Sequence, residues 1–351
     1  MPKLNFRFKS KIRRPLLAIR FVLRGAFIKF LRTIFFRKQN DLLCISLDTE
    51  NIADGTGAQI QRVLSVKLIA SVFQIGYVHR DFKSIQIHPL DPFQDQKSYS
   101  DYLIRLNETF CFPSLNANLE NFEIVMIRNI SIWKLLKLQI RSKVFKRKFH
   151  IVIQDPYPIS ESFVDKFSSI GFSFNKNFED GTLSRLVGEH DVVIHHRQGV
   201  GNMAIYPGQK ISRELDLEYF FQALDSIIMG GLCGAKEDVR VLILTDAPLE
   251  KIRYAPPADQ IDLWDGTPNF NSGTVLVEGN VLEEKFVQRG FQVKVLSGGD
   301  PLDAIFIMSK AKFLISARSS LSYVAGLLNQ AGTVFAAPDF WHSKPRVWRK
   351  I

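Results

Sequence analysis

Short apolar runs rich in β-branched residues alternate with helix-length amphipathic segments from about residue 41 onward. This alternation leaves few possible folds, because strands connected through helices pair in parallel and are covered by helices on both faces. Ten segments have the length and composition of such strands. They are Leu42–Leu47, Gly76–His79, Phe122–Met126, Phe149–Gln154, Val192–His195, Val239–Thr245, Thr274–Val277, Phe291–Leu296, Phe313–Ser316 and Thr333–Ala336.

The length of 351 residues corresponds to about two domains of roughly 100–200 residues each. The turn-rich stretch Asn175–Gly181 precedes a new strand and favours a boundary there. We therefore expect an α/β protein with a leader over residues 1–40 and two Rossmann-like, doubly wound domains over residues 41–185 and 186–345. Because parallel sheets bind ligands at the carboxyl ends of their strands, the two domains would face each other across a cleft.

The basic residues of the chain are concentrated at its N-terminus. The chain has 46 Lys and Arg against 35 Asp and Glu, and residues 1–39 hold twelve of the basic residues and no acidic one. Without those twelve, 34 basic residues remain against 35 acidic ones. The rest of the chain is close to neutral, so nucleic acid is not an expected partner.

The leader is amphipathic as well as basic. On a helix, Phe27, Phe30 and Leu31 would share one face, with cations on the other. Its uncharged runs are far shorter than the roughly 20 residues that span a bilayer, and it has no signal-peptide core. We expect residues 1–38 to bind an anionic membrane surface, which makes the protein peripheral on the cytoplasmic membrane face. A transit peptide, or docking of the leader on the protein's own core, stays open.

A second basic run, Lys134–Lys148, contains seven cations. It either extends the same membrane surface or is a solvated helix face. The cysteines, Cys44, Cys111 and Cys233, are far apart and have no CxxC or Cys/His spacing. We expect reduced thiols in a reducing compartment, without a disulfide framework or a zinc site.

The first motif that could carry chemistry is the glycine-rich turn Gly55-Thr56-Gly57-Ala58-Gln59, between a predicted strand and a predicted helix. Here Gly55, Gly57 and Gln59 would line the cleft, because glycines let backbone N–H groups approach a ligand at a helix N-terminus. A plain tight turn is equally compatible. The motif lacks the third glycine of a dinucleotide fingerprint and the lysine of a P-loop, which disfavours NAD and ATP.

The second motif is His195-His196-Arg197 at the end of an apolar strand, followed by glycines. Ligands of α/β sheets bind at this end of a strand. Arginine has the shape to bind phosphate through two hydrogen bonds, and a histidine there can hydrogen-bond a base or ribose. The alternative is a packed histidine and an arginine in a salt bridge.

The third motif, Arg318-Ser319-Ser320-Leu321-Ser322, lies between a predicted strand and a predicted helix. Hydroxyls and free N–H groups at a helix start form an anion site, and Arg318 adds positive charge. One serine would suffice for a helix cap, so three serines beside an arginine favour phosphate.

Other polar residues at element ends are candidates for the same ligand. Thr245 and Asp246 end a predicted strand and would face the cleft. Asp303 lies in the first turn of a helix that Asp300 and Pro301 open, where capping alone accounts for the acidic residues. No HExxH or strict DxD motif is present, so we expect no metal, and a diphosphate held by arginine and helix dipoles.

In this order the three motifs resemble those of the fucosyltransferase superfamily of GT-B fold. That superfamily includes bacterial alpha-1,2-fucosyltransferases and the alpha-1,6- and protein O-fucosyltransferases. Met308–Asn329 is similar to the last motif of the family, His195–Arg197 to its His-x-Arg signature, and Gly55–Gln59 to its N-terminal glycine-rich turn. The resemblance covers residues 55–329 and implies the GT-B arrangement of two Rossmann-like domains.

The resemblance implies a transferase that uses a GDP-sugar, above all GDP-fucose, as co-substrate and needs no metal or other cofactor. It implies one inverting displacement, with the donor bound mainly by the C-terminal domain. Arg197 would bind the diphosphate and His195 would lie near the guanine or ribose. The serines at 319, 320 and 322 would meet phosphate oxygens. A glycan or lipid-linked acceptor, in surface polysaccharide synthesis, would lie toward the N-terminal domain.

The chain departs from the family pattern at several positions. Gln198 and Val200 stand where the family often has an arginine and an aspartate, and Ala304 stands where it has a carboxylate for guanine, with Asp303 next to it. No general base is apparent, and Asp54 and Asp155 are candidates by position. Two other functions stay open: a sugar-nucleotide- or glycan-binding protein without catalysis, and an unrelated α/β enzyme acting on a phosphorylated small molecule.

Overall fold

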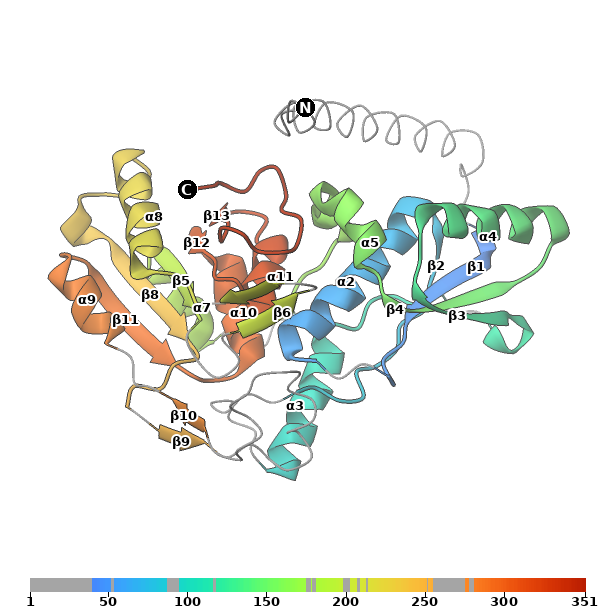
Figure 1. The fold of residues 1–351 in the computed structure, drawn as a ribbon, viewed down its shortest axis with the longest axis horizontal. Coiled ribbons are helices and arrows are strands. Elements are labelled where there is room, and N and C mark those ends of the chain that lie inside the picture. The colour runs from blue at the N-terminus through green and yellow to red at the C-terminus, as the bar shows by residue number, and fades with distance from the viewer. Residues whose placement is uncertain are drawn as a thin grey trace, which may run out of the picture.

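The computed structural model describes residues 40–51, 54–86, 95–115, 118–174, 178, 181–197, 203–206, 209–212, 214–250, 252–254, 275–277 and 281–351. Over these residues the protein is α/β, with one parallel sheet in each half of the chain (Figure 1). The predicted fold class of two Rossmann-like halves is therefore confirmed. The leader, except for its last residue Asn40, lies outside the described residues, as do Gln198 and Val200.

The first half contains a four-stranded parallel sheet in the order β2-β1-β4-β3. The crossovers through α2 and α4 shift in the same direction along the sheet, so both helices cover the same face. Gln139 of α4 donates to the carbonyl oxygen of Phe73, the last residue of α2, at 2.7 Å. The elements are β1 (Asn40–Leu47), α2 (Thr56–Phe73), β2 (Ile75–Tyr77), α3 (Gln96–Thr109), η1 (Leu119–Asn121), β3 (Glu123–Asn129), α4 (Ile132–Phe145), β4 (Phe149–Asp155), α5 (Tyr157–Ser160) and η2 (Glu161–Ile170).

The second half contains a five-stranded parallel sheet in the order β11-β8-β5-β12-β13. Two antiparallel pairs, β6 with β7 and β9 with β10, lie outside it. The elements are α7 (Thr182–Gly188), β5 (Val192–His196), β6 (Met203–Tyr206), β7 (Gln209–Ser212), α8 (Leu217–Met229), η3 (Lys236–Asp238), β8 (Arg240–Thr245), β9 (Ile252–Tyr254), β10 (Val275–Val277), α9 (Leu282–Gln288), β11 (Gln292–Ser297), α10 (Pro301–Lys310), β12 (Phe313–Ile315), α11 (Ser320–Leu328) and β13 (Thr333–Phe335).

The strand order of the second sheet reverses at β5. From β5 the chain proceeds to β8 and β11 on one side, and then returns to β12 and β13 on the other. Two neighbouring strands whose connections leave in opposite directions open a crevice at their carboxyl ends, which is where open α/β sheets bind ligands. The β5–β12 pair is that switch point.

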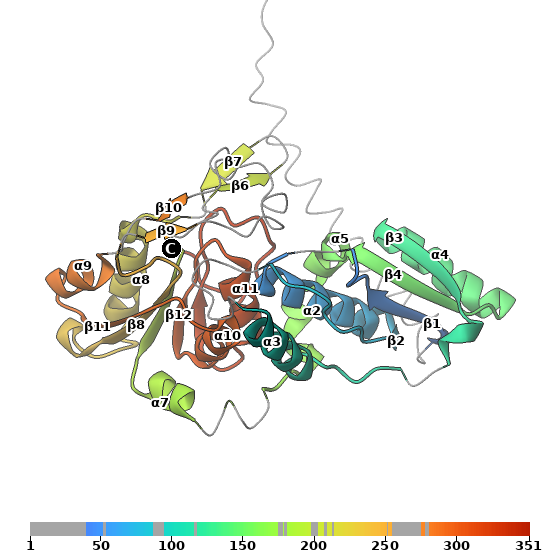
Figure 2. The same cartoon turned by 90° about the horizontal axis from the view of Figure 1, so that it is seen from below.

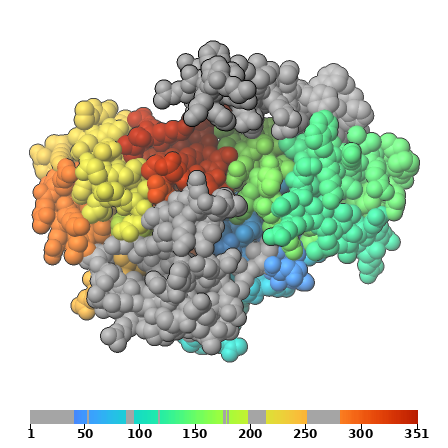
Figure 3. Space-filling model, viewed as in Figure 1, coloured from blue at the N-terminus to red at the C-terminus, as the bar shows by residue number. Residues whose placement is uncertain are grey.

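Helices α2 and α11 join the two halves. They lie side by side in the middle of the molecule in both orthogonal views (Figures 1 and 2). Past β13 the chain returns toward the first half, and the space-filling view shows its red C-terminal part between the yellow second half and the green first half (Figure 3). Among the described residues, no helix has the length and apolarity required to traverse a membrane.

Candidate functional site

The carboxyl edge of the second sheet brings two of the motifs to adjacent strands. Ile194 of β5 pairs with Ile315 of β12, and Arg197 and Arg318 each follow three residues later. On the other side of β5, His196 pairs with Thr245 of β8. Because paired strands lie about 4.8 Å apart, the chain segments that follow them begin side by side.

The two histidines of β5 have different surroundings. The His196 ring packs against Phe220 of α8, with ring centroids 5.7 Å apart, and its Nδ1 lies 3.2 Å from the Thr245 hydroxyl. His195 is 4% exposed, and its buried Nδ1 has no hydrogen-bond partner among the described residues. Burial lowers the pKa of both histidines to about 4. His196 is therefore a packed residue, whereas His195 keeps hydrogen-bonding capacity for a ligand or water.

Arg197 is buried beside a carboxylate. Its guanidinium Nη1 lies 2.5 Å from Asp246 Oδ2, and the two side chains are 8% and 19% exposed. Asp246 follows β8, whose last residue, Thr245, accepts a hydrogen bond from the backbone N–H of Ala247 at 3.1 Å. The predicted pair Thr245–Asp246 thus lies next to the predicted Arg197, and the ion pair holds the guanidinium at the sheet edge.

The start of α11 is braced by its own serines. Ser319 is the N-cap and accepts a hydrogen bond from the backbone N–H of Leu321. Ser322 is fully buried, and its hydroxyl accepts from the N–H of Ala317 at 3.2 Å and lies 3.3 Å from two backbone oxygens. Ser322 therefore shapes the loop from within, while Ser320 is half-buried at the first helical position.

Arg318 lies between the start of α11 and the segment after β13. Its Nε donates to the carbonyl oxygen of Pro338 at 2.9 Å, and its Nη2 lies 3.7 Å from Asp339 Oδ2. The Arg318 side chain is 17% exposed and Asp339 is 86% exposed. The exposed carboxylate screens little of the positive charge, so Arg318 adds to the positive potential of the helix start.

The glycine-rich turn meets this helix start directly. A Cβ atom on Gly57 would lie 2.4 Å from the backbone nitrogen of Leu321 and 2.7 Å from the carbonyl carbon of Ser320. The first turn of α2, with Gly55 as its N-cap, therefore packs backbone to backbone on the first turn of α11. Two helix N-termini, each equivalent to roughly half a positive charge, meet at this point. We call this contact of Gly57 with Ser320 and Leu321 the α2–α11 junction.

The remaining residue of that motif, Gln59, faces inward. It is 1% exposed, and its Nε2 donates to the carbonyl oxygen of Ser84 at 3.3 Å. Gln59 therefore holds the segment that contains Ser84 against α2.

The two candidate bases, Asp54 and Asp155, both lie near Arg62. Asp54 pairs with Arg62 at 2.9 Å, and Asp155 is close enough to stabilise the same guanidinium electrostatically. Asp155 accepts the backbone N–H of Tyr157, whose hydroxyl donates to the carbonyl oxygen of Ala58 in the first turn of α2. Both carboxylates thus lie near the helix contact, on the side of the first half.

Asp303 is engaged across the two halves. Arg105 of α3 binds Asp300 at 2.6 Å and Asp303 at 3.1 Å. Burial, together with the neighbouring Asp300 carboxylate, raises the pKa of Asp303, while Arg105 opposes the shift. Neither Arg105 nor Arg62 could be identified from the sequence. The partners of Arg105 lie on α10 and at its N-cap, far away along the chain, and the partner of Arg62, Asp54, lies in the loop before α2.

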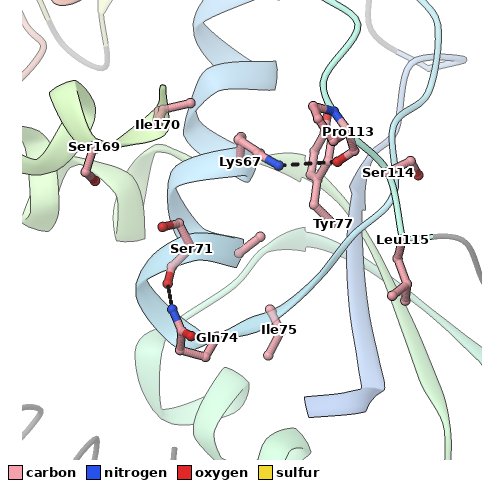
Figure 4. Close-up of a pocket in the computed structure, with 11 residues that line it drawn as sticks. Lys67, Ser71, Gln74, Ile75, Tyr77, Pro113, Ser114, Leu115, Ser169 and Ile170 are labelled. Atoms are coloured by element: carbon pink, nitrogen blue, oxygen red, sulfur yellow. Dashed lines mark hydrogen bonds between the residues drawn. The ribbon is translucent and has the colours of Figure 1, made fainter. Parts of the chain in front are cut away.

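A cavity of about 390 Å³ lies at the C-terminal end of α2 (Figure 4). It is lined by Lys67, Ser71 and Gln74 at the far end of α2, and by Tyr77 and Ser114. The 18 residues of α2 extend over roughly 27 Å, so this cavity is far from the junction at Gly57. Its position next to the negative end of the helix dipole does not favour an anion.

Among the described residues, no group of three or more His, Cys, Asp or Glu side chains is arranged to hold a metal ion. Positive potential comes instead from Arg318 and from the two helix N-termini that meet at Gly57, whereas Asp246 balances the charge of Arg197. Backbone N–H groups and arginines with these properties bind phosphate groups.

No protein-family model matches the chain, and no curated protein matches it significantly. The chain is similar in fold to several solved structures. For POFUT1 in complex with GDP-fucose the identity is 9% and the TM-score 0.44, over 90% of this chain and 99% of that chain. For the fucosyltransferase NodZ from Bradyrhizobium the identity is 13% and the TM-score 0.31, over 83% of this chain and 93% of that chain. For the E. coli heptosyltransferase WaaC with ADP-2-deoxy-2-fluoro heptose the identity is 10% and the TM-score 0.32, over 88% of this chain and 92% of that chain.

Proposed function

We propose that this protein is a glycosyltransferase that transfers a sugar, fucose from GDP-fucose, to a glycan or lipid-linked acceptor in surface polysaccharide synthesis. The observation that carries the proposal is the position of Arg197, which is buried at the switch point of the second sheet, next to the strand that leads into α11. The carboxyl ends of strands at a switch point, next to a helix N-terminus, favour the binding of phosphate groups. The nucleotide, the sugar and the acceptor are parts of the proposal.

In this proposal, Arg197, Arg318 and the backbone N–H of Ser320 bind the diphosphate, while the N–H of Ser319 donates to the carbonyl oxygen of Ala317 at 2.8 Å. Ser322 supports the loop, and His195 offers its buried ring nitrogen to the nucleoside. Thr245 and Asp246 orient Arg197 and His196, and Asp303 would meet the base only after leaving Arg105. Gly55, Gly57 and Gln59 shape the junction.

The proposed reaction is a single displacement with inversion. The acceptor hydroxyl oxygen attacks the anomeric carbon, and the bond from that carbon to the diphosphate oxygen breaks with its electron pair leaving on the nucleoside diphosphate. The hydroxyl proton passes to Asp54 or Asp155. Positive charge at the junction stabilises the leaving diphosphate, and no metal is invoked.

The domain limits, residues 41–185 and 186–345, belong to the same proposal. So does contact of residues 1–38 with an anionic membrane, which would keep the protein on the cytoplasmic face where a lipid-linked acceptor resides.

The first experiment compares melting temperatures of the full chain with GDP, UDP, ADP and CMP and with their sugar conjugates. A ligand at a hundred times its Kd stabilises the folded state by about 2.7 kcal/mol. GDP and GDP-fucose are expected to give the largest shift, and Arg197→Ala is expected to remove most of it. Losing charge-assisted bonds of about 1.5–3 kcal/mol weakens binding by roughly 10–100-fold.

The matched control is Arg240→Ala. Arg240 pairs with Asp191 at the opposite edge of the same sheet, at 3.3 Å, so its loss removes an arginine–aspartate pair without touching the junction. A GDP shift that survives Arg197→Ala would exclude the diphosphate role. Binding of a donor without turnover would favour a non-catalytic binding protein, and no preference for nucleoside diphosphates would favour an unrelated α/β enzyme.

A further inference from the structure

Helix α4 of the first half carries large apolar side chains on its outer face. Trp133, Ile140 and Val144 are 54%, 45% and 65% exposed, and their spacing of seven and four residues aligns them in one stripe. Phe145, at the end of the helix, is 66% exposed. The inner face is buried against the sheet through Leu135 and its neighbours.

Cations run along the same stripe. Lys134, Lys137 and Arg141 are exposed on α4, and Lys146, Arg147 and Lys148 continue the series after it. No acidic residue occurs between Lys134 and Lys148. We call the surface formed by Trp133, Lys134, Lys137, Ile140, Arg141, Val144 and Phe145 the α4 face.

The charge of the α4 face limits what covers it. The leader has twelve basic residues within residues 1–39 and no acidic one, so like charges oppose its docking here. A second copy of the same face would be repelled in the same way. A nucleic acid would satisfy the cations but leave the apolar stripe without a matching surface.

From these observations we propose that the α4 face docks on an anionic lipid bilayer. The apolar stripe would enter the boundary between headgroups and acyl chains, and the flanking lysines would lie among the lipid phosphates. Both orthogonal views place α4 at the end of the molecule away from the second sheet (Figures 1 and 2). Docking there leaves the α2–α11 junction uncovered, and it does not depend on the proposed transfer reaction.

The experiment is sedimentation of the full chain with phosphatidylcholine vesicles, with and without phosphatidylglycerol. Binding is expected only with the anionic lipid. Each lysine near such a surface contributes enough that Lys134→Gln with Lys137→Gln should weaken binding about thirty-fold. Ile140→Gln with Val144→Gln should weaken it about ten-fold by removing apolar contact.

The matched control is Lys97→Gln with Lys294→Gln, which removes two exposed lysines elsewhere and should leave vesicle binding unchanged. The leader is common to all variants, so unchanged binding by both α4 variants overturns the proposal. Binding to a homopolymeric RNA that falls in the lysine variant, while vesicle binding does not, also overturns it in favour of nucleic acid. The melting temperature of each variant, with and without GDP, reports its folding and donor binding separately.

Discussion

At the scale of single residues, three buried histidines tie the stability of the protein to pH. His150 is 2% exposed and lies 2.9 Å from the Ser46 hydroxyl, and His195 and His196 end β5. Burial lowers the pKa of each to about 4. The folded protein therefore keeps all three neutral in a range where an unfolded chain, with histidine pKa near 6.5, binds protons.

We expect the free energy of unfolding to fall as the pH decreases from about 6.5 to about 4. The lowered pKa means that stability is fully present above the unfolded value and is lost on acidification. At pH 5 the loss is on the order of 2 kcal/mol for each histidine. Urea unfolding of His150→Gln between pH 4 and 8 should show a shallower dependence than the unchanged chain. A slope equal to that of the unchanged chain would contradict the expectation, and the difference at pH 8 isolates the packing contribution.

The site residues show what the sequence can reveal at this scale. That Arg197, Thr245 and Asp246 lie at the ends of strands follows from apolar runs that stop at polar residues. The ion pair of Arg197 with Asp246 does not follow, because it depends on which strands are neighbours. The same holds for the pairing of Asp303 with Arg105, which lies 198 positions away.

At the scale of elements, the decisive contact is between the first turns of α2 and α11. Its cause is the missing side chain at Gly57, where a Cβ would fall 2.4 Å from a backbone nitrogen. Backbone atoms on both sides leave little room for adjustment, since neither can change rotamer. The glycine that looked suited to approaching a phosphate is required for approaching another helix.

Gly57→Ala is expected to lower the free energy of unfolding by about 1–3 kcal/mol, the usual effect of overpacking. The control is Gly188→Ala at the end of α7, where an added Cβ meets nothing within 4 Å. Alanine there should be neutral or stabilise by up to about 1 kcal/mol. Equal effects of the two substitutions, measured by chemical denaturation, would show that the close approach at Gly57 has no energetic role.

Most elements could be predicted from hydrophobic pattern alone. The predicted strands of both sheets are present within three residues at each end, because parallel strands buried on both faces give continuous apolar runs. The predicted strand Thr274–Val277 exists as β10, but it pairs antiparallel with β9 outside the main sheet. Its sequence gives no sign of this, since a short apolar run does not specify its partner.

At the scale of the whole molecule, the C-terminal segment fastens the second half to the first. His342 is buried, and its Nδ1 lies 2.9 Å from Glu161 Oε1 of η2. Arg346 pairs with Asp165 of the same element at 3.2 Å, and its backbone N–H donates to that carboxylate. These contacts join parts of the chain about 181 positions apart.

Replacing Glu161 by Gln and Asp165 by Asn should weaken this fastening. The exposed Arg346 pair contributes about 0–1 kcal/mol, and the buried His342 loses a charged partner at about 1–3 kcal/mol. Calorimetry should then show a lower melting temperature and a broader transition, as the halves unfold less cooperatively. The comparison is Asp191→Asn, whose Arg240 partner lies in the same half. A single sharp transition unchanged in both variants would contradict this role.

The backbone contact at Gly57 has a mechanical consequence. A rotation of one half against the other that keeps this contact has its axis close to Gly57. Atoms next to Gly57 would scarcely move, while the outer end of the first half, where α4 lies, would travel furthest.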